Sequence, residues 1–101
     1  MTGGPSTSDR AHVQLDDSPG RRSGLAEVEV DGETVVYDEE TQKLHHLDPV
    51  ASVVWALLDG HTPLTKTCDE LAQAFGTPVE TIRPDVLSVV GFFAAEGLLD
   101  R

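Results

Sequence analysis

The chain has 101 residues, of which 18 are acidic and 7 are basic, and its formal net charge is −11. This length predicts one domain with a modest core, and the negative charge argues against nucleic acids and anionic membranes as partners. The single cysteine excludes a disulfide framework, and no apolar segment resembles a signal peptide or a membrane span, so a cytoplasmic location is expected.

Residues 1–24 are predicted to form a disordered N-terminal arm. The stretch is rich in Gly, Ser, Pro, Asp and Arg, and Val13 and Leu15 are isolated apolar residues within it. The folded domain is therefore expected to comprise residues 25–101.

Three short strands are predicted to form an antiparallel meander. They are LAEVEV (25–30), ETVVYD (33–38) and KLHHL (43–47). The Asp-Gly pair after the first run is a favoured two-residue hairpin turn. Alternation in the first strand places Val28 and Val30 on one face and acidic residues on the other, so something is expected to cover the apolar face.

Three helices are predicted to follow the strands. Their start signals are Asp48-Pro49, Thr62-Pro63 and the capping box Thr77-Pro78-Val79-Glu80, and their stop signals are Gly60, Gly76 and Gly97. Helical spacing predicts two buried stripes, with Val50, Val53, Val54, Leu57 and Leu58 in the first helix and Leu64, Cys68, Leu71, Ala72 and Phe75 in the second.

The third helix is expected to run to about Glu96, with a kink or break at Pro84 and its long part starting there. Leu98 and Leu99 are expected to fold back onto the core. The whole order predicts an α+β, winged-helix-like fold, in which a three-stranded antiparallel sheet is followed by three helices.

Candidate catalytic and metal-binding residues are few. His45 and His46 are neighbours on a strand and point to opposite faces, so no metal site is predicted. Cys68 lies on a core stripe and is expected to be a structural thiol, while Glu27 and Glu29 are expected to lie on a solvated face. The sequence therefore predicts neither an enzyme nor a cofactor.

The third helix and the third strand together suggest a binding groove. The apolar arc of the helix spans roughly 220°, whereas a core-facing stripe needs only about 100° or more. Either the chain itself covers this excess or a partner does. The third strand comes last in the meander, so its edge is expected to be open, and an extended peptide could add to it and place side chains on the helix.

From Val35 to Leu99 the chain resembles the PqqD-like family of peptide-recognition elements and peptide chaperones. The resemblance depends on Leu47-Asp48, on Trp55 with Leu57-Leu58-Asp59-Gly60, on Leu71 and Phe75, and on Asp85-Val86-Leu87 through Phe93 to Glu96-Gly97-Leu98-Leu99. It implies non-catalytic binding of the leader region of a ribosomally synthesised precursor peptide. The leader would then be presented to a tailoring enzyme such as a radical-SAM protein, a cyclase or a protease.

The resemblance also implies which residues bind the peptide. They are Lys43, Leu44, His45 and His46 on the third strand, and Arg83, Val86, Leu87, Val90 and Ala94 on the third helix. The side of the helix that faces the groove stays open at this point. Pro84 and Gly91 depart from the family pattern and could alter the floor of the groove.

Two other functions remain as alternatives. One is a winged-helix DNA-binding regulator, although Arg83 is the only basic residue from Thr81 to Glu96. The other is a small protein–protein adaptor or an antitoxin-like partner.

Overall fold

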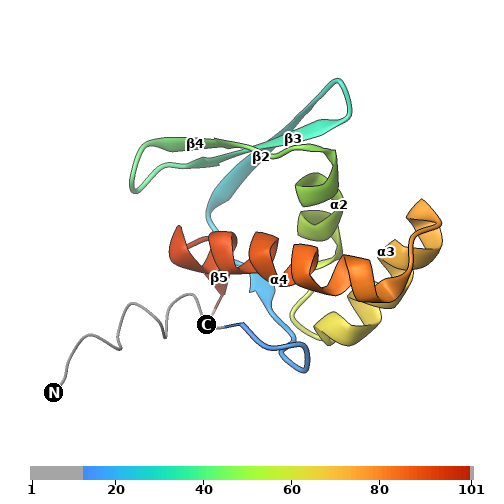
Figure 1. Cartoon of the computed structure of the whole chain (residues 1–101). Coiled ribbons are helices and arrows are strands. Elements are labelled where there is room, and N and C mark those ends of the chain that lie inside the picture. Colours follow the sequence, from blue (N-terminus) through green and yellow to red (C-terminus); the bar gives the residue numbers. More distant parts are fainter. Residues whose placement is uncertain (1–12, 101) are drawn as a thin grey trace, which may run out of the picture.

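The computed structural model describes residues 13–100, and its main elements follow the predicted order (Figure 1). The strands are β1 (Gly20–Arg21), β2 (Leu25–Val30), β3 (Glu33–Asp38), β4 (Lys43–His46) and β5 (Leu99–Asp100), and the helices are α2 (Pro49–Leu57), α3 (Leu64–Phe75) and α4 (Val79–Ala95). Two short strands, β1 and β5, were not predicted.

Strands β2, β3 and β4 form an antiparallel sheet in that order, so β4 is an outer strand. Asp31 and Gly32 join β2 to β3 with positive φ angles of 54° and 81°, as the Asp-Gly turn requires. The sheet lies on one side of the three helices (Figure 1). Helix α2 leads from the end of β4 toward α3 and α4. The predicted α+β fold is confirmed.

The expected cover over the apolar face of the first strand is absent from the part of the chain that the structure describes. The helix-facing side of the sheet carries Val36 and His45, which are opposite each other and buried. Glu27 lies opposite Val36 in the register, so the acidic side of β2 faces the same way. Val28 and Val30 lie on the outer face and are 59% and 50% exposed. No residue of β2 is fully buried, because the helices pack against β3 and β4 instead.

A buried serine joins the sheet to the first helix. The Thr34 amide donates to Ser52 Oγ at 2.8 Å, and this hydroxyl donates to the Leu47 carbonyl at 3.1 Å. The Leu47 amide donates back to the Thr34 carbonyl at 2.9 Å. Asp48 caps the helix by accepting from the Ala51 amide at 2.8 Å, as predicted. The strand therefore turns into α2 at a fixed position.

The predicted buried stripe of α2 was partly wrong. Val54 and Leu58 are buried as expected, and Trp55, which the stripe omitted, is also buried. Val50 and Val53 are 38% and 37% exposed. The helix is thus rotated about its axis relative to the prediction, because packing of the large indole against the core decides which face turns inward.

Helix α3 follows its prediction except at its end. Leu64, Cys68 and Leu71 are buried, and Gly76 ends the helix in the left-handed conformation with φ 62°. Phe75 is 45% exposed, because it is the last helical residue and extends past the core.

Helix α4 is continuous from Val79 to Ala95, so the predicted start near Pro84 was wrong. Pro84 lies in the second turn, where its missing N–H removes one backbone hydrogen bond near the helix start. The predicted capping box was also wrong, because no side chain caps the helix and the Thr77 hydroxyl donates to the Phe75 carbonyl at 3.3 Å.

The core lies between the helices and the inner side of β3 and β4. Trp55 and Phe93 meet at its centre edge to face, with ring centroids 5.1 Å apart and an interplanar angle of 76°. The buried apolar residues are Val36, Leu47, Val54, Trp55, Leu58, Leu64, Cys68, Leu71, Ile82, Val86, Val90, Phe93 and Leu98. Leu98 folds back onto the core as predicted.

Residues 13–24 belong to the fold, which corrects this part of the predicted disordered arm. Val13 and Leu15 pack against the core. The Leu64 amide donates to the Asp17 carbonyl at 2.9 Å, and β1 pairs with β5. These long-range hydrogen bonds order a stretch whose composition is that of a loop. Residues 1–12 lie outside the described part of the chain.

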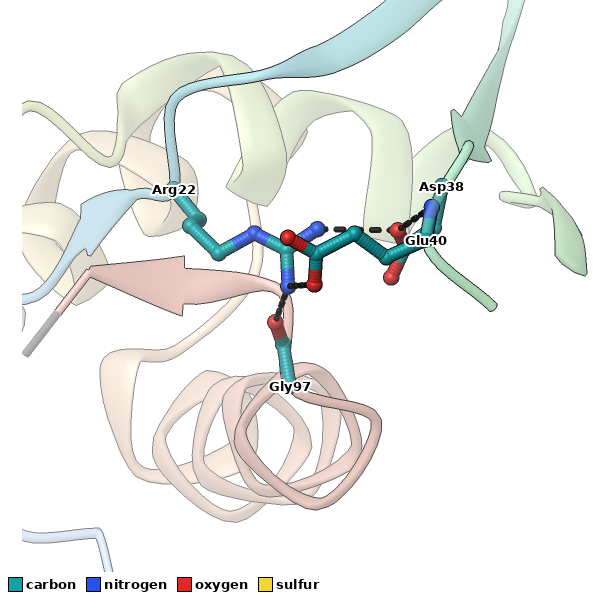
Figure 2. A network of polar contacts seen from close by, with 4 residues as sticks. All are labelled: Arg22, Asp38, Glu40 and Gly97. Carbon is teal, nitrogen blue, oxygen red and sulfur yellow. Dashed lines mark hydrogen bonds and ion pairs between the residues drawn. The ribbon is translucent and has the colours of Figure 1, made fainter. Parts of the chain in front are cut away.

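A polar network ties this N-terminal segment to the sheet and to α4 (Figure 2). Arg22 donates to Asp38 Oδ1 and to the Gly97 carbonyl, both at 2.9 Å, and its Nη1 lies 4.0 Å from Glu40 Oε1. Asp38 is 1% exposed. Burial acts to raise the pKa of Asp38, but the hydrogen bonds from Arg22 and from the Glu40 amide, with the Arg22 charge, hold the pKa below its usual value.

We expect acid to destabilise the fold as these carboxylates become protonated. Asp59 accepts from the His61 amide, the Thr62 amide and the Thr62 hydroxyl, each at 2.8 Å, and these bonds lower its pKa from 3.8 to about 2. A carboxylate with a lower pKa in the folded state stabilises the fold above its unfolded pKa, and this contribution is lost as the pH falls through the folded pKa. The free energy of unfolding should therefore decrease from pH 4 down to about pH 2.

Urea unfolding followed by circular dichroism at a series of pH values would measure this decrease. Asp59→Asn keeps an oxygen acceptor but has no charge to lose, so its stability should depend less on pH in this range. An identical pH dependence in the variant would show that Asp59 does not contribute.

Candidate functional site

The outer edge of β4 presents free backbone groups. In an antiparallel ladder, alternate residues direct both backbone groups to the same neighbouring strand. The Leu47 amide donates to the Thr34 carbonyl, so Leu47 faces β3, and in the same register His45 and Lys43 also direct their backbone groups toward β3. The N–H and C=O groups of Leu44 and His46 therefore point away from the sheet. No strand lies beyond β4 in the part of the chain that the structure describes.

Helix α4 runs beside this edge. Lys43 Nζ lies 3.6 Å from Glu96 Oε1, and the imidazole of His45 meets the ring of Phe92 edge to face at a centroid distance of 6.2 Å. These two contacts place β4 along the C-terminal half of α4 (Figure 1).

An open pocket continues this line toward the start of α4. Its lining residues are Asp48, Val50, Asp85, Ser88 and Val89. Together with Phe92 and Glu96, the helix residues of the pocket recur at intervals of one to four positions, so they share one side of α4. We name the space between this side of α4 and the β4–α2 segment the β4–α4 groove.

The four predicted strand residues divide between two faces. Lys43 and His45 point toward α4 and contact it. Leu44 is 67% exposed on the outer face, and His46 on the same face pairs with Glu33 at 2.7 Å. The side chains of Leu44 and His46 therefore lie away from the groove, although their backbone groups form its open edge.

Two of the five predicted helix residues lie in the core. Val86 and Val90 have no exposed surface and belong to the core, so they cannot line a surface groove. Leu87 and Ala94 are partly buried and Arg83 is exposed, and they take no part in the Lys43–Glu96 and His45–Phe92 contacts. Whether Arg83, Leu87 or Ala94 contacts a peptide stays a prediction.

Sequence reasoning did not assign Ser88, Val89, Phe92 or Glu96 to the groove. Phe92 is 47% exposed and lies on the opposite shoulder of the helix from Leu87 and Ala94. Large apolar residues on both shoulders were visible in the sequence, but only the contacts with β4 decide between them.

The candidate catalytic residues lie either in the core or on the exposed strand β2. Cys68 is fully buried, and burial raises the pKa of its thiol, with Asp69 adding to this rise and Arg83 opposing it. Glu27 and Glu29 are exposed on β2. Between residues 13 and 100, no group of three or more His, Cys, Asp or Glu side chains could hold a metal ion. Within the same range no helix combines the length and the hydropathy that a membrane span requires.

Solved structures share this fold. TbiB1 in complex with the TbiA(beta) leader peptide matches with a TM-score of 0.72 and 21% identity, over 80% of this chain and 94% of that chain. The PqqD truncation of Methylobacterium extorquens PqqCD, described as a functional and stand-alone RiPP recognition element, matches with a TM-score of 0.78 and 21% identity, over 92% of this chain and 99% of that chain. At these identities the likeness shows the fold.

The sequence itself gives the family. No curated protein matches the chain, but the model of the family described as coenzyme PQQ synthesis protein D (PqqD) matches residues 33–99, from β3 to the first residue of β5. This match covers more than half of the chain and includes both sides of the β4–α4 groove, so the resemblance noted in the sequence is confirmed and this chain belongs to the PqqD family.

Proposed function

We propose that this protein binds the leader region of a ribosomally synthesised precursor peptide and presents it to a tailoring enzyme. The observation that carries the proposal is the open edge of β4 beside the groove on α4. The family assignment supports it, and so does a neighbour of the same fold that was solved with a leader peptide. The same function was expected from the sequence.

In this proposal the leader adds to the sheet as a fourth strand. Its main chain bonds to the outward N–H and C=O groups of Leu44 and His46. Every second side chain of an extended peptide then points into the β4–α4 groove, onto Val89 and Phe92. The backbone bonds would provide affinity for many extended peptides, while the groove would select among their side chains.

Charge favours peptides over nucleic acids as partners. The net charge of −11 and the carboxylates of Asp48 and Asp85 in the pocket oppose the approach of phosphates. The same charges favour the association of leaders that carry basic residues.

The protein is proposed to act without catalysis, in the cytoplasm, beside a radical-SAM protein, a cyclase or a protease. Its buried thiol and its exposed, separate carboxylates offer no activated nucleophile or acid–base pair. The chemistry would therefore belong to the partner enzyme.

Titration with a leader peptide tests the proposal. The probe is a synthetic peptide that spans the leader of a candidate precursor, and ¹⁵N–¹H NMR follows the amides. We expect the amides of Leu44 and His46 and those of α4 near Phe92 to shift, while those of Val28 and Val30 in β2 stay in place. Saturation without any shift in β4 would contradict strand addition, and a scrambled peptide is the control.

A further inference from the structure

Among the described residues, three buried side-chain polar atoms have no hydrogen-bond partner. They are His45 Nε2, Trp55 Nε1 and Thr67 Oγ1. Trp55 and Thr67 are 1% and 0% exposed and belong to helices that pack around the core. His45 differs from them, because it lies on the outer strand β4 and its ring contacts the half-exposed Phe92 in the groove.

An unpartnered buried polar atom destabilises the free protein. Leaving such a group without a hydrogen bond costs about 1–3 kcal/mol. A ligand that supplies the missing partner recovers much of this cost, whereas an apolar ligand side chain does not. The imidazole of His45, which is 8% exposed, is therefore suited to discriminate among side chains that enter the groove.

We infer that His45 selects for an uncharged hydrogen-bonding side chain, a hydroxyl or a carboxamide, at one position of the bound leader. This inference rests on the proposed function. Phe92, which is 47% exposed, contacts the His45 ring, so a side chain bound in the groove beside Phe92 would lie near this imidazole. His45 is thus a specificity-determining residue of the β4–α4 groove.

The surrounding charges decide which polar group is accepted. Carboxylates of Asp48, Asp85 and Glu96 line the groove and disfavour an anionic ligand side chain. An ammonium or guanidinium group would lose its hydration at a buried nitrogen and is better placed beside those carboxylates. A hydroxyl or a carboxamide can both donate and accept, so it can pair with a ring nitrogen whether or not that nitrogen carries a proton.

Selection from a display library of random 12-residue peptides tests the inference without a known leader. The library is selected on the full chain and on His45→Phe, which keeps an aromatic ring against Phe92 but has no ring nitrogen. We expect binders of the full chain to share Ser, Thr, Tyr, Asn or Gln at one position, and this preference should disappear on His45→Phe. Replacing that residue by an apolar one should weaken binding to the full chain by about 2- to 12-fold, as the loss of one hydrogen bond predicts.

His61→Phe is the matched control, because it makes the same exchange at an exposed histidine in the loop after α2, outside β4 and the β4–α4 groove. It should keep the preference. If both variants and the full chain select the same residues, the role of His45 is wrong while peptide binding stands. If the full chain selects no peptide at all, the proposed function fails.

A second measurement covers the case in which His45→Phe does not fold. The ring nitrogens of His45 in the unmodified chain can be followed by ¹⁵N NMR while a selected peptide is added. A shift of Nε2 that disappears when the selected polar residue is replaced supports the hydrogen bond. An unchanged Nε2 resonance at saturation overturns it.

Discussion

Phe93→Ala should destabilise the fold by about 3–5 kcal/mol, as expected for the loss of a fully buried phenylalanine. Phe93 has no exposed surface, and its ring contacts Trp55 edge to face at the centre of the core. Because a domain of this size has only about 5–15 kcal/mol of stability, this loss is a large part of the total. Urea unfolding followed by tryptophan fluorescence measures this directly.

The neighbouring phenylalanine gives a matched control. Phe92 is 47% exposed and lies in the β4–α4 groove, so Phe92→Ala should change stability much less than Phe93→Ala while it weakens peptide binding. Equal losses of stability in the two variants would show that the core does not depend on Phe93 in the way its burial indicates.

The order and limits of the main elements could be predicted because local chemistry determines them. The Asp31-Gly32 turn, the Asp48 cap and the left-handed Gly76 each act through a few neighbouring residues. Pro84 misled the prediction, because one missing backbone bond near the start of a helix is tolerated when the rest of the helix is well packed.

The rotation of each element about its axis could not be predicted with the same success. Val50 and Val53 have the spacing of a buried stripe, yet Trp55 occupies the core in their place. In the same way the alternation of β2 indicated two faces but not which of them the helices approach, so Val28 and Val30 are exposed. These choices depend on contacts between segments that are distant in the sequence.

In the candidate site, too, one part follows from the local sequence pattern and another part depends on packing between distant segments. The outer position of β4 follows from a meander of three strands, and the sequence predicted it correctly. The groove side of α4 depends on the rotation of that helix, and the predicted Val86 and Val90 are in the core, whereas Phe92 faces β4. The ordering of residues 13–24 was also missed, because it comes from hydrogen bonds to segments such as Leu64 and Leu98 and not from local composition.

Leu44→Pro should weaken leader binding by roughly 10- to 100-fold, because one peptide carbonyl loses its backbone donor. The lost N–H points away from β3, so the pairing of Lys43 and His45 with β3 should remain. An outer strand tolerates proline at such a position. Isothermal titration calorimetry with the leader peptide measures affinity, and circular dichroism checks the fold.

Leu44→Ala separates the backbone from the side chain. It keeps the N–H and removes a side chain that is 67% exposed on the outer face, away from the groove. We therefore expect near-normal affinity for Leu44→Ala and a large loss for Leu44→Pro. Strand addition at β4 depends on main-chain groups, so it requires this difference. If the alanine variant loses as much affinity as the proline variant, the peptide contacts the outer face of the sheet and the groove is not its binding site.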